Sequence, residues 1–146
     1  RVSDWYLHAA VSEPSAPQRA STAERHGTRH PALLAALEKM EATIEAPLPR
    51  AAIARAAGIS ARQLDRLFAA DLGESLGAAY RRLRLDHATR LLRQSPLSLA
   101  QVAYATGFSS PSHFSRAFRA AYGCPPGGWL SASSSTLRAA RKHSSA

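Results

Sequence analysis

The sequence has little of the chemistry that most enzymes and metal proteins need. Cys124 is the single cysteine among 146 residues, which excludes an internal disulfide and argues against a cysteine-rich zinc site. The six histidines are not spaced as metal ligands, and the chain has no glycine-rich phosphate loop. We therefore expect no cofactor and no catalytic activity.

Long apolar runs are missing as well. The chain has no run of about 18 apolar residues and no signal segment at its start. We therefore expect no membrane span and no membrane partner, and a cytoplasmic, nucleoid-associated protein. Because the chain opens with Arg1 rather than Met, we also expect it to be a fragment of a longer polypeptide.

Negative charge is scarce, above all toward the end of the chain. The last acidic residue is Asp86, and seven Arg or Lys residues follow it. Nineteen basic residues, 17 of them Arg, outweigh 10 acidic ones and give a formal net charge of +9. This balance points to a polyanionic partner, either nucleic acid or an anionic membrane surface. Arg is suited to bidentate contacts with phosphate and guanine.

Helical signals fill the middle of the chain. Pro31 suits the first position of a helix, and Leu33, Leu37, Met40 and Ile44 fall on one face of it. Further helices are predicted between Pro49 and Gly58, Ser60 and Gly73, Ser75 and about Gln94, Pro96 and Gly107, Pro111 and Gly123, and around Trp129. No alternating strand pattern competes, so we expect an all-α fold of about seven helices.

Two segments of the chain repeat each other. Residues 47–73 resemble residues 96–123: Ile53, Ala54 and Gly58 recur as Val102, Ala103 and Gly107, and Leu64, Arg66, Phe68 and Gly73 recur as Phe114, Arg116, Phe118 and Gly123. A small residue lets one helix approach the next closely, and a glycine permits the left-handed backbone of a tight turn. Each segment is therefore predicted to be a helix-turn-helix.

The second helix of each repeat is predicted to have an apolar and a polar face. Apolar residues four apart face the core, while two polar sets point outward: Arg62, Asp65 and Arg66, and Ser112, Ser115 and Arg116. Packed helical hairpins of a solenoid are the alternative. Two copies are too few for a solenoid, and both outward faces have an Arg at the same place, which favours two DNA-binding motifs.

Three stretches resemble the DNA-binding domain of the AraC/XylS family of transcriptional regulators: RLDHATRLL at 84–92, AYATGFSSPSHFSRAF at 103–118 and YGCPPGGW at 122–129. The resemblance covers about residues 31–131. It implies two homeodomain-like helix-turn-helix subdomains joined by a long linker helix. It also implies sequence-specific binding to double-stranded DNA at two successive major-groove segments, and contact with RNA polymerase.

The resemblance gives the domain organisation that we expect. Residues 1–11 are predicted to form a short helix, and residues 12–30, which have no apolar period, a linker. Residues 1–30 together look like the trailing helix and linker of an amidotransferase-like sensing domain, which implies that a small-molecule effector binds a domain absent from this chain. The first subdomain is expected at 31–74, the linker helix at 75–95, the second subdomain at 96–131 and a flexible basic tail at 132–146.

The family's base-reading positions fall on Arg62, Asp65, Arg66, Pro111, Ser112, Ser115 and Arg116. Arg66 and Arg116 are the best candidates for contacts with guanine. Asp65 has two open interpretations: it accepts from cytosine N4, or it orients Arg62 or Arg66. Pro111 departs from the polar residue often found there, so we expect the second motif to read fewer bases.

Contacts to phosphate are expected from a second set of residues: Ser60, Arg81, Arg84, Arg90, Arg93, Ser110 and His113. An alternative role for Arg84 is to form a structural ion pair with Asp86 or another carboxylate. For His113, the alternative to a DNA contact is a partly buried helix residue beside Phe114, and we favour this alternative.

Sequence features argue against two other functions. A DNA-repair enzyme module would need a zinc-held nucleophilic cysteine, and Cys124 has no base or cation near it in sequence. A basic nucleoid or RNA-binding protein without sequence preference is permitted by electrostatics alone, but it needs no matched recognition helices.

Overall fold

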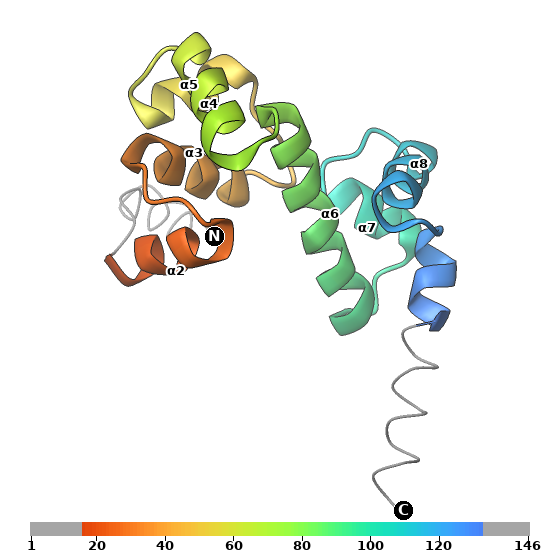
Figure 1. Ribbon diagram of the computed structural model, residues 1–146. Coiled ribbons are helices and arrows are strands. Elements are labelled where there is room, and N and C mark those ends of the chain that lie inside the picture. The colour runs from red at the N-terminus through yellow and green to blue at the C-terminus, as the bar shows by residue number, and fades with distance from the viewer. Residues whose placement is uncertain (1–15, 133–146) are drawn as a thin grey trace, which may run out of the picture. The chain divides into compact units, whose positions relative to one another are not determined.

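The computed structural model describes residues 16–132, which form helices joined by short loops (Figure 1). Its helices are α2 (Ala16–His26), α3 (Pro31–Ala42), α4 (Arg50–Ala57), α5 (Ala61–Leu67), the π-helical turn η1 (Phe68–Leu72), α6 (Leu76–Gln94), α7 (Leu99–Ala105) and α8 (Pro111–Tyr122). Residues 126–132 are also helical. Residues 16–132 contain no strand, which confirms the predicted all-α class. Within that range no helix is long and apolar enough to span a membrane.

The chain divides into two compact units. The first unit comprises the chain up to Ala42 together with Leu48–Gly77, and the second comprises Thr43–Pro47 and the chain from Ala78 onward. The segment 43–47, which connects α3 to α4, therefore packs within the second unit. Most of the predicted linker helix also belongs to the second unit, so α6 is a part of that unit's core rather than a free connector.

The core of the first unit forms as the apolar spacing predicts. Leu33, Leu37 and Met40 of α3 are fully buried, together with one apolar side chain from each of the next elements, Ile53, Leu64 and Phe68. Ile44, predicted on the same stripe, lies beyond the end of α3 at Ala42 and is half-buried. Removing a core side chain of this size costs about 2–5 kcal/mol of stability.

Helix α2 corrects one prediction. Residues 12–30 were expected to be a linker, but Ala16–His26 form a helix of the first unit. Arg25 forms an ion pair with Glu41 of α3, and the Thr28 hydroxyl donates to Asp71 Oδ2 over 2.8 Å. These polar contacts join residues far apart in the chain, so apolar periodicity gave no signal of them. The short helix predicted at 1–11 and the tail beyond 132 lie outside the described residues.

The second unit is built on aromatic packing. Leu85, Ala88 and Leu92 of α6 form a buried cluster with Val102, Ala103, Phe108, Phe114 and Phe118. Figure 1 shows α7 and α8 together on one side of α6. The Phe118 ring lies 5.7 Å from both the Phe114 and the Trp129 ring, in edge contacts that favour one fixed arrangement of α8.

The two helix-turn-helix turns share the same backbone hydrogen bonds. Gly58 and Gly107 have φ angles of 75° and 80°, the left-handed region in which glycine is favoured. The next residue donates its N–H to the carbonyl five residues back: Ile59 to Ala54 and Phe108 to Ala103. The sequence repeat is therefore a repeat of backbone geometry within each unit.

Candidate nucleic-acid interface

Helix α5 exposes the predicted base-reading arginines of the first motif. Ser60 caps the helix by accepting from the N–H of Gln63, and the Gln63 side chain accepts from the Ser60 N–H in return. The buried Leu64 fixes which face turns inward. Arg62 and Arg66, one helical turn apart, are exposed on another face. Their guanidinium groups are thus available to an external anion.

Asp65 is engaged by a residue that the sequence analysis did not consider. Its Oδ2 forms an ion pair with Nη1 of Arg50, the first residue of α4. Both side chains are about half exposed, at 58% for Arg50 and 41% for Asp65. A carboxylate has about four acceptor sites, so the pair leaves Asp65 capacity to accept from a base. Spacing along the chain gave no indication of this pair.

Helix α8 has the corresponding arrangement in the second unit. Ser110 caps it by accepting from the N–H of His113, and Pro111 occupies the first turn. Phe114 and Phe118 are buried. Ser112 and Arg116 are exposed and Ser115 is half-buried. The same face also exposes Arg119, one turn beyond Arg116, which the sequence analysis did not single out.

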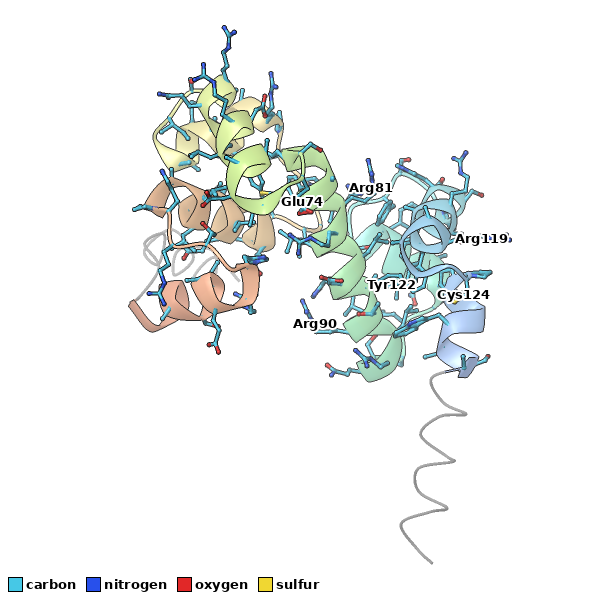
Figure 2. The ribbon with its side chains drawn as sticks, viewed as in Figure 1. Glu74, Arg81, Arg90, Arg119, Tyr122 and Cys124 are labelled. Carbon is cyan, nitrogen blue, oxygen red and sulfur yellow. The ribbon has the colours of Figure 1, made fainter. Side chains whose placement is uncertain are left out.

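The predicted phosphate contacts of α6 have different surroundings. Figure 2 labels Arg81 near the start of the helix and Arg90 near its end, and both side chains are exposed. Arg90 lies 3.3 Å from Nδ1 of His87, and burial together with this cation lowers the pKa of His87. Arg93 is exposed, with its guanidinium carbon 5.5 Å from the centre of the Trp129 ring.

Arg84 does not fit the phosphate role that was predicted for it. Its guanidinium donates to two backbone carbonyls inside the second unit, those of Thr106 and Gly107. The predicted alternative, an ion pair with Asp86 or another carboxylate, is not what the structure shows either, because the hydrogen-bond partners of Arg84 are carbonyl oxygens. A side chain directed inward toward carbonyl oxygens is a structural group, so we correct the assignment.

His113 also differs from the interpretation that we favoured. The side chain is exposed rather than partly buried. Its ring meets the edge of Phe108 at 5.3 Å, and its Nδ1 lies 3.2 Å from the Ser109 hydroxyl. The imidazole is therefore held at the first turn of α8 with one edge in solvent.

An open groove of about 810 Å³ lies between α6 and α8 within the second unit. Three predicted DNA-contacting residues, Arg81, His113 and Arg116, line it beside an apolar wall that includes Leu85 and Ala117. The groove also contains the Asp86–Tyr122 hydrogen bond, and burial followed by this bond raises the pKa of Tyr122. The structure thus brings predicted contacts from two helices around one basic groove.

The charge of this surface is strongly one-sided. Between Ala78 and Ala132, seven arginines stand beside a single carboxylate, Asp86, and that carboxylate accepts a hydrogen bond from Tyr122. Across the described ranges, no group of three or more His, Cys, Asp or Glu side chains is placed to hold a metal ion. Such a surface is suited to phosphate rather than to a cation.

Comparisons with known proteins agree with this geometry. A family model described as a helix-turn-helix domain matches residues 53–132, more than half of the chain. A transcriptional regulator from Chromobacterium violaceum, described as an AraC-type DNA-binding domain-containing protein, aligns with a TM-score of 0.67 and 42% identity over 69% of this chain and 90% of that one. This chain belongs to the AraC-type helix-turn-helix family.

Two further relatives refine the AraC-type assignment. The chain is 65% identical over 127 residues to the transcriptional regulator GlxA of Rhizobium meliloti (strain 1021). The aligned region covers 87% of this chain and 39% of that protein. The chain thus spans about two fifths of the length of that relative. The DNA-binding domain of AdpA, a global transcriptional factor solved with a target DNA, aligns with a TM-score of 0.65 and 26% identity over 70% of this chain and 93% of that one.

The AraC-type family confirms the predicted class of function. The chain is a helix-turn-helix domain of a family of transcriptional regulators that bind DNA sequence-specifically. The resemblance stated from residues 84–129 is confirmed by the family match, which includes all three stretches. Which side chains of this AraC-type domain contact bases or phosphates stays a prediction.

Proposed function

We propose that this chain recognises double-stranded DNA by placing α5 in one major-groove segment and α8 in the next, with the segment centres about one helical turn, roughly 34 Å, apart. The observation that supports this most directly is the matched build of the two helices. Each follows a left-handed glycine, begins at a serine cap, buries an apolar pair four residues apart and exposes one equivalent arginine.

Arg66 and Arg116 are the proposed guanine readers. Arginine donates two parallel hydrogen bonds to guanine O6 and N7, and each such pair is worth about 1–3 kcal/mol of discrimination against a wrong base. Arg62, Asp65, Ser112 and Ser115 are proposed to contact neighbouring bases. Arg81, Arg90 and Arg93 are proposed to contact phosphates, and Ser60, Ser110 and His113 to do so from the helix starts.

Contacts beyond DNA follow from the likeness to regulators. RNA polymerase is a proposed partner. A small-molecule effector is proposed to bind a domain outside this chain, because the chain covers 39% of GlxA. Transcription in vitro with purified polymerase, from a template that contains the bound site, tests the first of these.

The DNA-binding proposal is tested by competition at fixed salt. We expect the wild-type chain to retain a specific labelled duplex in excess random duplex. Arg66→Ala and Arg116→Ala should each lose specific affinity by about tenfold or more, and lose much less affinity for random DNA, because base contacts are absent there.

Arg29→Ala is the matched control, since it removes the same charge from an exposed site in the loop between α2 and α3. It should leave discrimination unchanged. If Arg66→Ala and Arg116→Ala weakened specific and random binding equally, these two residues would not be base readers. If the wild-type chain failed to discriminate at all, the chain would be a non-specific binder.

A further inference from the structure

Arg84 of α6 holds the turn of the second helix-turn-helix from one side. Its Nε donates to the carbonyl of Thr106 over 2.8 Å, and its Nη2 donates to the carbonyl of Gly107 over 2.7 Å. The guanidinium carbon lies 4.1 Å from the centre of the next side chain along, the Phe108 ring. One side chain therefore binds three consecutive residues of the turn.

The connector between α3 and α4 packs closely against the same turn. A Cβ atom placed on Gly107 would lie 2.6 Å from the carbonyl oxygen of Ile44 and 2.7 Å from the ring of Pro47. The connector is itself anchored to α6, because the Tyr80 hydroxyl donates to the carbonyl of Thr43 over 3.2 Å. The glycine at position 107 is thus required by both conformation and space.

The turn is linked directly to the start of α8. The Phe108 ring lies 5.4 Å from the Phe114 ring and 5.3 Å from the His113 ring, and both of these belong to the first turn of α8. Residues in the first turns of a recognition helix are the ones that reach base edges. A displacement of the turn would therefore displace Ser112 and Arg116 relative to any bound duplex.

The Arg84 side chain is less exposed to solvent than the side chains of Arg81 and Arg90. Its side chain is half-buried, whereas those of Arg81 and Arg90 are exposed, and burial lowers the pKa of Arg84. Two of its donors and one face of its guanidinium are already used inside the unit. A group in this state contributes through the turn rather than through a phosphate.

We propose that Arg84 is a positioning residue for base recognition by α8, which sets the specificity of the second half-site without contacting DNA. The proposal rests on the proposed function of α8 as a recognition helix. In this proposal Arg84 fixes the turn and, through it, the first residues of α8. The α3–α4 connector packs against the same turn.

The test uses Arg84→Met, which keeps the length and the apolar stem of the side chain but removes its donors. Binding is measured to duplexes with both half-sites intact, with the first scrambled and with the second scrambled, each over a range of salt. We expect discrimination at the second half-site to fall by about tenfold. Discrimination at the first half-site and the slope of log K against log salt should not change.

Arg90→Met is the matched control, an exposed arginine on the same helix. As a proposed phosphate contact it should reduce the magnitude of the salt slope by about 0.9 and keep the discrimination at both half-sites. The two variants therefore change different measured quantities. Loss of fold in the second unit would also remove its proposed phosphate contacts and reduce the salt slope, which distinguishes it from the expected result for Arg84→Met.

Three results would overturn the proposal for Arg84→Met: a reduced salt slope with discrimination kept, an equal loss at both half-sites, or no change. Should Arg84→Met not fold, Arg84→Lys takes its place, because one ammonium cannot donate along two carbonyl directions and stack on Phe108. We then expect a smaller loss confined to the second half-site, and the same three results overturn it. A wild-type chain without any preferred site would instead contradict the proposed function itself.

Discussion

At the scale of single residues, the arginines of this domain have distinct surroundings. Arg66 and Arg116 are exposed on the outward faces of α5 and α8, where a guanidinium can donate to a base edge. Arg50 is paired with Asp65, and Arg84 is bonded to two carbonyls. The same residue type therefore occurs on an exposed helix face, in an ion pair with a carboxylate and against carbonyls inside a unit, and the proposed roles follow these surroundings.

Tyr122→Phe tests the importance of Asp86, the one carboxylate between Ala78 and Ala132. The change removes the hydroxyl that donates to Asp86 Oδ1 and leaves this half-buried carboxylate without that donor. Hydrogen bonds to charged groups contribute about 1.5–3 kcal/mol, so we expect a loss in the free energy of unfolding of about 1–2 kcal/mol. Urea denaturation at neutral pH measures it.

Tyr104→Phe is the control for this change, because Tyr104 is 55% exposed on α7 and its hydroxyl is accessible to water. It should change the free energy of unfolding by less than about 0.5 kcal/mol. Equal stabilities for the Tyr122 and Tyr104 variants would show that the Asp86–Tyr122 bond contributes nothing.

At the scale of elements, α2 is attached to the first unit by charge. Burial alone would raise the pKa of Glu41 in α3, but hydrogen bonds and charge from His26 and Arg25 outweigh it, and the pKa is lowered. Nε2 of His26 lies 3.6 Å from Glu41 Oε2, and its side chain is 4% exposed. The ionised form of Glu41 thus binds α2 to α3.

Because of this lowered pKa, we expect the first unit to lose stability as the pH falls. The contribution of Glu41 is present above its ordinary pKa of 4.5 and is lost as the pH falls through the lowered folded-state value. We expect the free energy of unfolding of the wild-type chain to fall more steeply below that pH than that of Glu41→Gln. Denaturation series from neutral pH to about pH 3 measure the difference, and parallel curves for the two proteins would contradict the assignment.

Much of the arrangement of helices follows from local signals in the sequence. The bounds of α8, the left-handed glycines at 58 and 107 and the serine caps at 60 and 110 are where proline, glycine and serine placed them. Helix α2 could not be predicted in this way, because its ion pair with Glu41 joins residues 16 positions apart. The π-helical turn at Phe68–Leu72 is a shift of backbone hydrogen bonds that leaves no mark on side-chain spacing.

The candidate site was predictable only in part. Outward positions on α5 and α8 follow from a helical period once the buried Leu64 and Phe114 are known. The pairing of Arg50 with Asp65 and the inward direction of Arg84 depend on how elements pack, and a list of basic residues could not separate Arg84 from Arg81. Charge composition therefore identified the type of partner, and packing decided which arginines are available to it.

At the scale of the whole molecule, two compact units each contain one serine-capped helix that we propose as a recognition helix. A net charge of +9 attracts any polyanion, so charge alone does not explain selectivity. The central claim is that each unit reads its own short DNA segment.

Selection of bound sequences from a pool of random duplexes tests that claim most directly. The wild-type chain should enrich two short conserved blocks with centres about 10 base pairs apart. In the same selection, Arg66→Ala should weaken one block and Arg116→Ala the other. A single enriched block, or two blocks that both fade with either variant, would contradict the account.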